Sequence, residues 1–170
     1  MNRCAVLIFA ASLASALQAQ GPNAVIAEQR QAYNAIKNNL IKAAEKMPES
    51  DYDFKATPDV RTFGQLIMHV AQAQMGTCAA VKGEQKRIDA SKTAKPDAVA
   101  SLKASFDECD AAWDSMGDAG AHEMITLGRG GQRSKIGALV AYTIVHSNEE
   151  YGYLAVYMRL KGIVPPSSER

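Results

Sequence analysis

Four long segments of the chain carry apolar residues at helical spacing, and signals of β structure between them are nearly absent. Their residue ranges are 23–47, 62–82, 96–117 and 134–162. No Asn-Gly or Asp-Gly turn joins two alternating runs, as a short β-hairpin would favour. Segments of this length and spacing predict an all-α protein that folds as a four-helix bundle.

Turn and capping residues mark the ends of these segments. Thr62 and Gln65 have the spacing of a capping box, and Gly83 is a typical helix stop. Pro96 suits a first helical turn, and Gly162 ends the last segment. The linkers are long enough to allow crossovers, and the glycine-containing stretch 118–133 is interpreted as a plain loop. The run 136–145 is apolar nearly all round and is expected to be the most buried part of the chain.

Composition limits the class of protein. The chain has 170 residues, of which 47% are hydrophobic and 22% charged, as in one compact globular domain. Lys plus Arg number 19 and Asp plus Glu 18, and aromatic residues make up 6%. Nucleic-acid binding is not expected, because it needs a clustered basic surface or a platform of aromatic side chains.

The first twenty residues differ from the rest of the chain. Arg3 precedes an apolar run that ends in small residues near Ala16 and Ala19. This pattern predicts a signal peptide over residues 1–19, cut after Ala19 or alternatively after Ala16, and a domain over residues 20–170. An apolar helix that stays attached is the alternative. The expected location is therefore secreted or periplasmic, with no membrane contact after cleavage, since no other window is long and apolar enough to span a bilayer.

Two cysteines, Cys78 and Cys109, remain after the expected cleavage. In an exported domain they predict a disulfide, and two buried free thiols are the alternative. Each cysteine lies far along its own helix from the first turn. A disulfide therefore requires the second and third helices to run parallel, because antiparallel helices would hold the two Cα atoms too far apart. Such a bond favours an up-down-down-up bundle.

Two of the three histidines are candidate metal ligands. His69 shares an apolar helix stripe, and His146 follows an apolar run, so both are expected to point inward. Glu150 lies four residues after His146 and therefore on the same helix face. Two imidazoles and a carboxylate form a ligand set used by catalytic zinc and by non-haem iron. The alternative is that both histidines are hydrogen-bonded core residues and that Glu150 faces solvent.

Two stretches of sequence resemble the DinB/YfiT-like superfamily. The first is DYDFKATPDVRTFGQLIMHVA, and the second and more specific is VHSNEEYGYLAVYMRLKGIVPPSS. The resemblance implies an up-down-down-up four-helix bundle that binds a divalent metal ion, such as Zn, Ni, Mn or Fe. Carried over to this chain, the ligands are His69, His146 and Glu150. Family members usually have a histidine where this chain has Glu150.

The hypothesis from the sequence is an exported, metal-dependent enzyme of hydrolase or transferase type acting on a small-molecule substrate. Glu149 or Tyr153 is the expected proton partner. The chain lacks a serine nucleophile elbow, a phosphate-binding loop, a CxxC motif and an HExxH motif. The alternative is a non-catalytic bundle with a degenerate metal site that binds a small ligand or a protein partner. Bundles of this size often dimerise, so a homodimer is compatible with either hypothesis.

Overall fold

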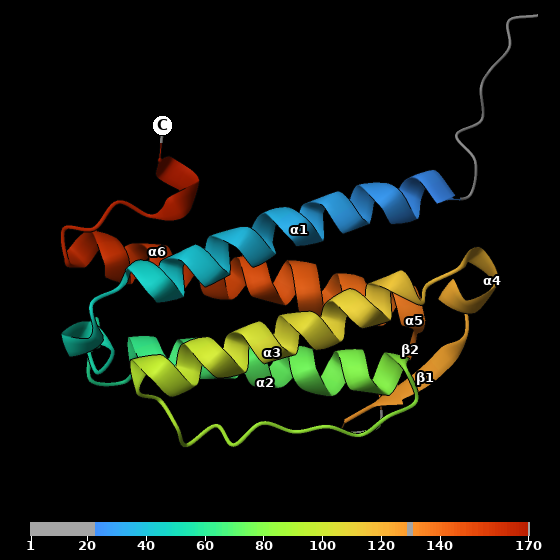
Figure 1. Cartoon of the computed structure of the whole chain (residues 1–170), viewed down its shortest axis with the longest axis horizontal. Helices are drawn as coiled ribbons and strands as arrows, with labels where there is room; N and C mark the ends of the chain where they lie inside the picture. Colours follow the sequence, from blue (N-terminus) through green and yellow to red (C-terminus); the bar gives the residue numbers. More distant parts are fainter. Residues whose placement is uncertain (1–22, 129–130, 170) are drawn as a thin grey trace, which may run out of the picture.

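The structure is a computed structural model that describes residues 23–128 and 131–169, and it is mainly helical (Figure 1). The signal peptide expected over residues 1–19 lies outside the described residues. The principal elements are α1 (Asn23–Lys46), α2 (Phe63–Val81), α3 (Lys95–Asp114), α5 (Lys135–Leu139), the π-helical η2 (Val140–Val145) and α6 (His146–Leu160). The shorter ones are η1 (Glu49–Asp51), α4 (Asp118–Ala121), β1 (Met124–Leu127), β2 (Gly131–Ser134) and η3 (Pro166–Ser168).

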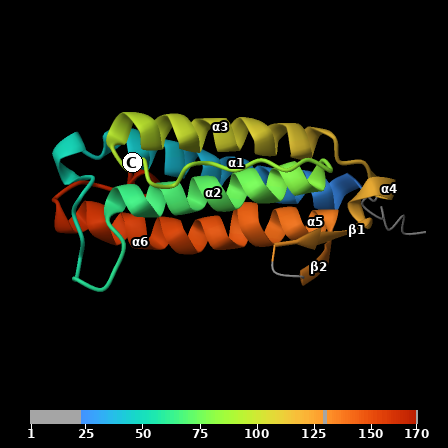
Figure 2. The same ribbon diagram turned by 90° about the horizontal axis from the view of Figure 1, so that it is seen from below.

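The long helices lie side by side around one apolar core. Figures 1 and 2 show α2 and α3 running in one direction and α1 and α6 running in the other. Segment 82–94 returns along the outside of the molecule, so that α3 can start beside the start of α2. Residues from all the long helices fill the interior, among them Tyr33, Leu40, Phe63, Phe106 and Leu154. The mainly helical fold expected from the sequence is confirmed.

The helix ends follow the sequence signals closely. The Thr62 hydroxyl accepts a hydrogen bond from the Gln65 backbone, and the Gln65 side chain accepts one from the Thr62 backbone, which completes the capping box. Gly83 and Gly162 both have a positive φ, the conformation that glycine adopts most readily after a helix. The third long helix begins at Lys95, with Pro96 in its first turn.

Gly64 lies where segment 82–94 crosses the start of α2. A Cβ atom at this position would lie 2.2 Å from the Thr93 carbonyl oxygen and 3.1 Å from the Tyr52 ring. Only glycine therefore lets the segment pass this close to the helix. Gly152 in α6 has no such neighbour, since a Cβ atom there would meet open space.

Two local expectations are wrong, and a third holds with one irregularity. Stretch 118–133 is not a plain loop, because it contains the short helix α4 and the antiparallel strands β1 and β2, in register from Met124–Ser134 to Leu127–Gly131. The last long segment is helical as expected, but the π-helical η2 interrupts its regularity between α5 and α6. Run 136–145 is also not the most buried part of the chain. Val145 is 60% exposed, and α2 contributes more buried residues.

A disulfide bond joins Cys78 of α2 to Cys109 of α3, as predicted. The two Cα atoms are 4.9 Å apart, and the cysteines are separated by 31 residues in sequence. Figure 1 shows that α2 and α3 run in the same direction, and the short distance between the two Cα atoms places the cysteines beside each other on the two helices. The parallel arrangement that the disulfide required is therefore present.

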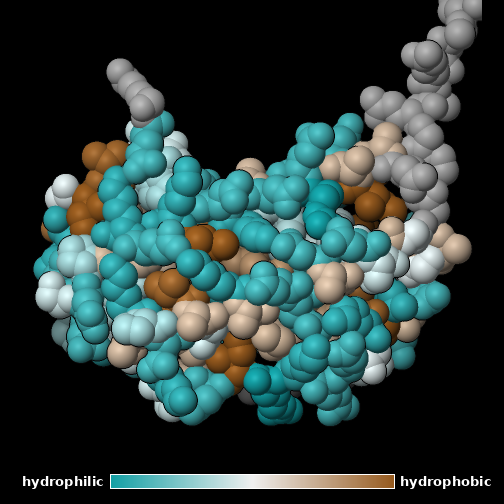
Figure 3. Space-filling model, viewed as in Figure 1, coloured by the Kyte–Doolittle hydropathy of each residue, from teal (hydrophilic) through white to brown (hydrophobic). Residues whose placement is uncertain are grey.

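Hydrophilic side chains dominate the face shown in Figure 3, where hydrophobic residues occur in small separate groups. Within the described residues, no helix combines the length and apolar character needed to cross a membrane.

Candidate metal centre

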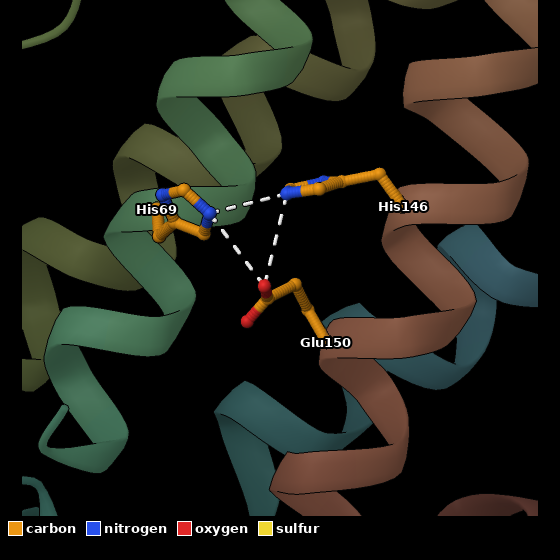
Figure 4. A group of neighbouring side chains, drawn as sticks. All are labelled: His69, His146 and Glu150. Atoms are coloured by element: carbon orange, nitrogen blue, oxygen red, sulfur yellow. Dashed lines mark hydrogen bonds and ion pairs between the residues drawn. The ribbon is translucent and has the colours of Figure 1, made fainter. Parts of the chain in front are cut away.

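His69, His146 and Glu150 converge in one cluster. Figure 4 shows His69 extending from α2 toward His146 and Glu150, which extend from α6. The Nε2 atoms of the two histidines are 3.1 Å apart. Glu150 Oε1 lies 3.5 Å from His69 Nε2 and 3.7 Å from His146 Nε2. The three residues that the sequence analysis selected as ligands are thus brought together.

These distances suit a shared metal ion. Ligand atoms about 2.0–2.2 Å from a tetrahedral ion lie about 3.3–3.6 Å from one another. The two separations that involve Glu150 are close to that range, and the separation between the histidines is slightly shorter. Nitrogen and carboxylate oxygen are also the donor atoms that Zn, Fe, Ni and Mn accept in proteins.

Burial leaves part of the cluster without hydrogen-bond partners. The Glu150 side chain is only 7% exposed, and within the described part of the chain its Oε2 atom and His146 Nδ1 have no partner. Burial raises the pKa of Glu150 above its usual value, against the opposing charges of His146 and Arg61. A buried carboxylate with an unsatisfied oxygen is costly unless a cation neutralises it. A metal ion would supply that cation.

The pKa of His69 shifts in the direction that favours ligation. Burial lowers it, and the positive charges of Arg61 and His146 lower it further, while Glu149 opposes them. A histidine with a lowered pKa stays neutral to a lower pH, and neutral imidazole is the form that binds a metal ion.

An open cavity of about 320 Å³ gives solvent access to this cluster from the His69 side. Its lining residues are Arg61, Gln65, Met68, His69, Gln72 and Ala90. Gln65, His69 and Gln72 occur at helical spacing on one face of α2, whereas Ala90 belongs to segment 82–94. The histidine cluster is therefore not sealed inside a filled core.

Comparisons with known proteins agree with this architecture. The family model of the DinB superfamily matches residues 32–154, most of the chain. The chain belongs to the DinB superfamily. A solved DinB-like protein from Bacillus cereus ATCC 10987 has a similar fold, with a TM-score of 0.70 and 16% sequence identity. The match covers 83% of this chain and 95% of that one. A comparison with curated proteins gave no match.

The other candidate residues of this DinB-superfamily protein lie outside the cluster. Glu149 is exposed on α6, although its charge acts on both His69 and Glu150. Tyr153 is 50% exposed, and within the described residues neither side chain makes a hydrogen bond to the cluster. His122 is exposed at the end of α4, away from the other two histidines.

Two features next to His146 were missed in the sequence. The π-helical η2 ends directly before His146, which begins α6. Ser147, the next residue, is buried and accepts a hydrogen bond of 3.0 Å from the Gln74 side chain of α2. Gln74 is fully buried, but its position in an apolar stripe gave no hint of its partner. Helical spacing could have revealed the polar row of Gln65, His69 and Gln72.

Proposed function

We propose that this DinB-superfamily protein is an exported enzyme of hydrolase or transferase type that depends on a divalent metal ion. The observation that carries the proposal is the convergence of His69, His146 and Glu150 beside an open cavity. We also assign α1, α2, α3 and the α5–α6 segment to the up-down-down-up bundle implied by the family resemblance. In this assignment the metal site bridges the second and fourth helices of the bundle.

The three ligand residues would hold Zn, Ni, Mn or Fe. A bound ion of this kind would act as a Lewis acid and lower the pKa of a coordinated water. Side chains of the protein would carry out the proton transfers. Glu149 or Tyr153, one turn apart on the exposed side of α6, would exchange a proton with a small-molecule substrate bound beside the cluster. Nothing in the proposal requires a nucleic acid or a membrane.

A non-catalytic role is the second candidate. The distance of 3.1 Å between the Nε2 atoms is also that of a direct hydrogen bond between a neutral donor and acceptor. In that case the histidines hold α2 and α6 together, and the protein binds a small ligand or a partner without chemistry. A homodimer is compatible with both candidates.

Metal content distinguishes the metal-dependent enzyme from the non-catalytic bundle. Protein purified without chelators or a histidine tag is incubated with Zn, Ni, Mn or Fe(II), desalted and measured by elemental analysis. The wild type should retain about one ion per chain. His69→Ala and Glu150→Gln should lose it, and His122→Ala, the matched control, should keep it. A wild type that retains no metal would overturn the enzyme proposal in favour of the structural histidine pair.

Export is the remaining part of the proposal. The disulfide supports it, because such bonds persist in oxidising compartments and are rare in the cytosol. N-terminal sequencing of the protein isolated from a secreting bacterial host should show Gln20 as the first residue. An N-terminus at Met1 would contradict cleavage.

A further inference from the structure

The residues that line the cavity beside His69 include one charged side chain. Of the residues that line it, Arg61 carries a full positive charge, and Gln65 and Gln72 contribute neutral amides. The others are Met68, Ala90 and the candidate ligand His69. No acidic side chain is among these lining residues, so the cavity presents hydrogen-bond donors and a cation to whatever enters it.

The backbone of Arg61 is held firmly, while its side chain is free. The buried Tyr157 donates a hydrogen bond of 2.8 Å to the Arg61 carbonyl oxygen, and the capping box starts at the next residue. Within residues 23–128 and 131–169, the guanidinium group forms no ion pair with a carboxylate. An arginine with an unpaired guanidinium is available to bind an anion, because no carboxylate of the described residues competes for it.

Arg61 lines the same cavity as the candidate ligand His69. Glu149 is not among the lining residues. A divalent ion held by two neutral histidines and one carboxylate would carry a net positive charge, and Arg61 would add a second positive charge at the cavity.

We propose that the site takes a small carboxylate substrate, whose carboxylate pairs with Arg61 while its reacting group faces the His69–His146–Glu150 cluster. This inference rests on the proposed function and names its substrate class. The guanidinium fork matches a carboxylate with two parallel hydrogen bonds, and the amides of Gln65 and Gln72 can donate to further oxygens. A cavity of about 320 Å³ is at the small end of ligand sites, which favours a small molecule.

The test measures binding of succinate, and of its uncharged analogue succinamide, to the zinc-loaded protein by calorimetry at fixed ionic strength. Succinate should bind at least about tenfold more tightly than succinamide. Arg61→Gln should weaken succinate binding at least about tenfold, and Arg61→Lys, which keeps the charge without the fork, should weaken it less. Arg30→Gln, a control on α1 whose side chain pairs with Asp114 at the end of α3, should leave it unchanged. Equal succinate affinity in the wild type and Arg61→Gln would overturn the inference.

A parallel zinc titration separates this inference from the proposed function. Arg61 is not a ligand, so Arg61→Gln should bind zinc as the wild type does while losing succinate. If the wild type binds no zinc, the proposed function fails, and succinate is titrated into the metal-free protein. Binding that depends on Arg61 would then still support a carboxylate site, whereas no binding would overturn it as well.

Discussion

At the scale of single residues, Glu150 distinguishes this site from the three-histidine set that the family resemblance implies. Its carboxylate reaches to within 3.7 Å of both histidine nitrogens, so the three side chains still form a candidate ligand set. Carboxylate is a harder ligand than imidazole and suits Mn, whereas imidazole suits Zn and Ni. The identity of this one residue should therefore affect which ion the site prefers.

Glu150→His should shift metal preference from Mn toward Zn and Ni, because it replaces an oxygen ligand by nitrogen. Competition titrations of Mn against Zn would show the ratio of the two dissociation constants changing by about tenfold or more in favour of Zn. Glu149→His, at the adjacent exposed position, is the control and should leave the ratio as it is. An unchanged ratio in Glu150→His would mean that Glu150 does not contact the ion.

A second buried carboxylate, Glu108, is structural. Its side chain is 9% exposed and accepts hydrogen bonds from Lys82 at 2.9 Å and from Lys86 at 2.8 Å. Burial alone would raise the pKa of Glu108, but the two lysines together hold it below the usual value. A carboxyl group whose pKa is lowered by folding stabilises the protein above its ordinary pKa, and this contribution is lost as the pH falls.

Glu108→Gln should therefore lower the free energy of unfolding by about 1–2 kcal/mol at pH 7. The difference from the wild type should shrink as the pH falls below about 4.3, where the unfolded wild-type chain takes up a proton. Urea denaturation at a series of pH values measures this, with the exposed neighbour Asp107→Asn as control. A difference that stays constant down to low pH would show that the lysine contacts do not stabilise the charged form.

The sequence was sufficient to select the three side chains that converge in the candidate site, but not their surroundings. His146 and Glu150 are four residues apart on one helix, and this spacing alone places them on one face. Arg61 and Gln74 gave no comparable signal. The role of Arg61 depends on the cavity formed with segment 82–94, and that of Gln74 depends on contact with Ser147 of another helix.

At the scale of elements, strong capping signals predicted the helix ends, whereas irregular segments were missed. The capping residue Thr62 and the stop residues Gly83 and Gly162 act through local backbone geometry, which a sequence pattern records. The π-helical η2 lies in a run that is apolar nearly all round. Because apolar residues occur on every side of this run, their spacing cannot distinguish a π-helix from an α-helix. Strands β1 and β2 have only four residues each, too few for a recognisable alternation.

Two glycines make a matched test of how segment 82–94 packs on α2. Gly64→Ala should lower the free energy of unfolding by about 1–3 kcal/mol, because the new Cβ atom would overlap the Thr93 carbonyl oxygen and force the segment outward. Gly152→Ala should instead raise it by about 0.5–1 kcal/mol, because alanine favours the helix and the space is open. Chemical denaturation of both variants decides the matter. A neutral Gly64→Ala would mean that the segment does not approach the helix this closely.

At the scale of the whole molecule, the disulfide and the candidate metal site connect different pairs of helices. The disulfide joins α2 to α3, whereas the candidate ligands join α2 to α6. Both pairs include α2, and Cys78 lies nine residues after His69, about 14 Å along the helix axis. The two cross-links are thus far enough apart to act independently.

Replacing both cysteines, Cys78→Ala with Cys109→Ala, should lower the free energy of unfolding by about 3–4 kcal/mol, the chain-entropy value for a closed loop of this length. Metal content at 25 °C should stay the same, because the ligands do not depend on α3 for their contact. Urea denaturation and elemental analysis of the same samples measure the two quantities. The wild type treated with a reducing agent serves as the comparison, and it should approach the stability of the double variant. Loss of metal from a double variant that is still folded would show instead that the α2–α3 pair must be fixed before α2 can present His69 to α6.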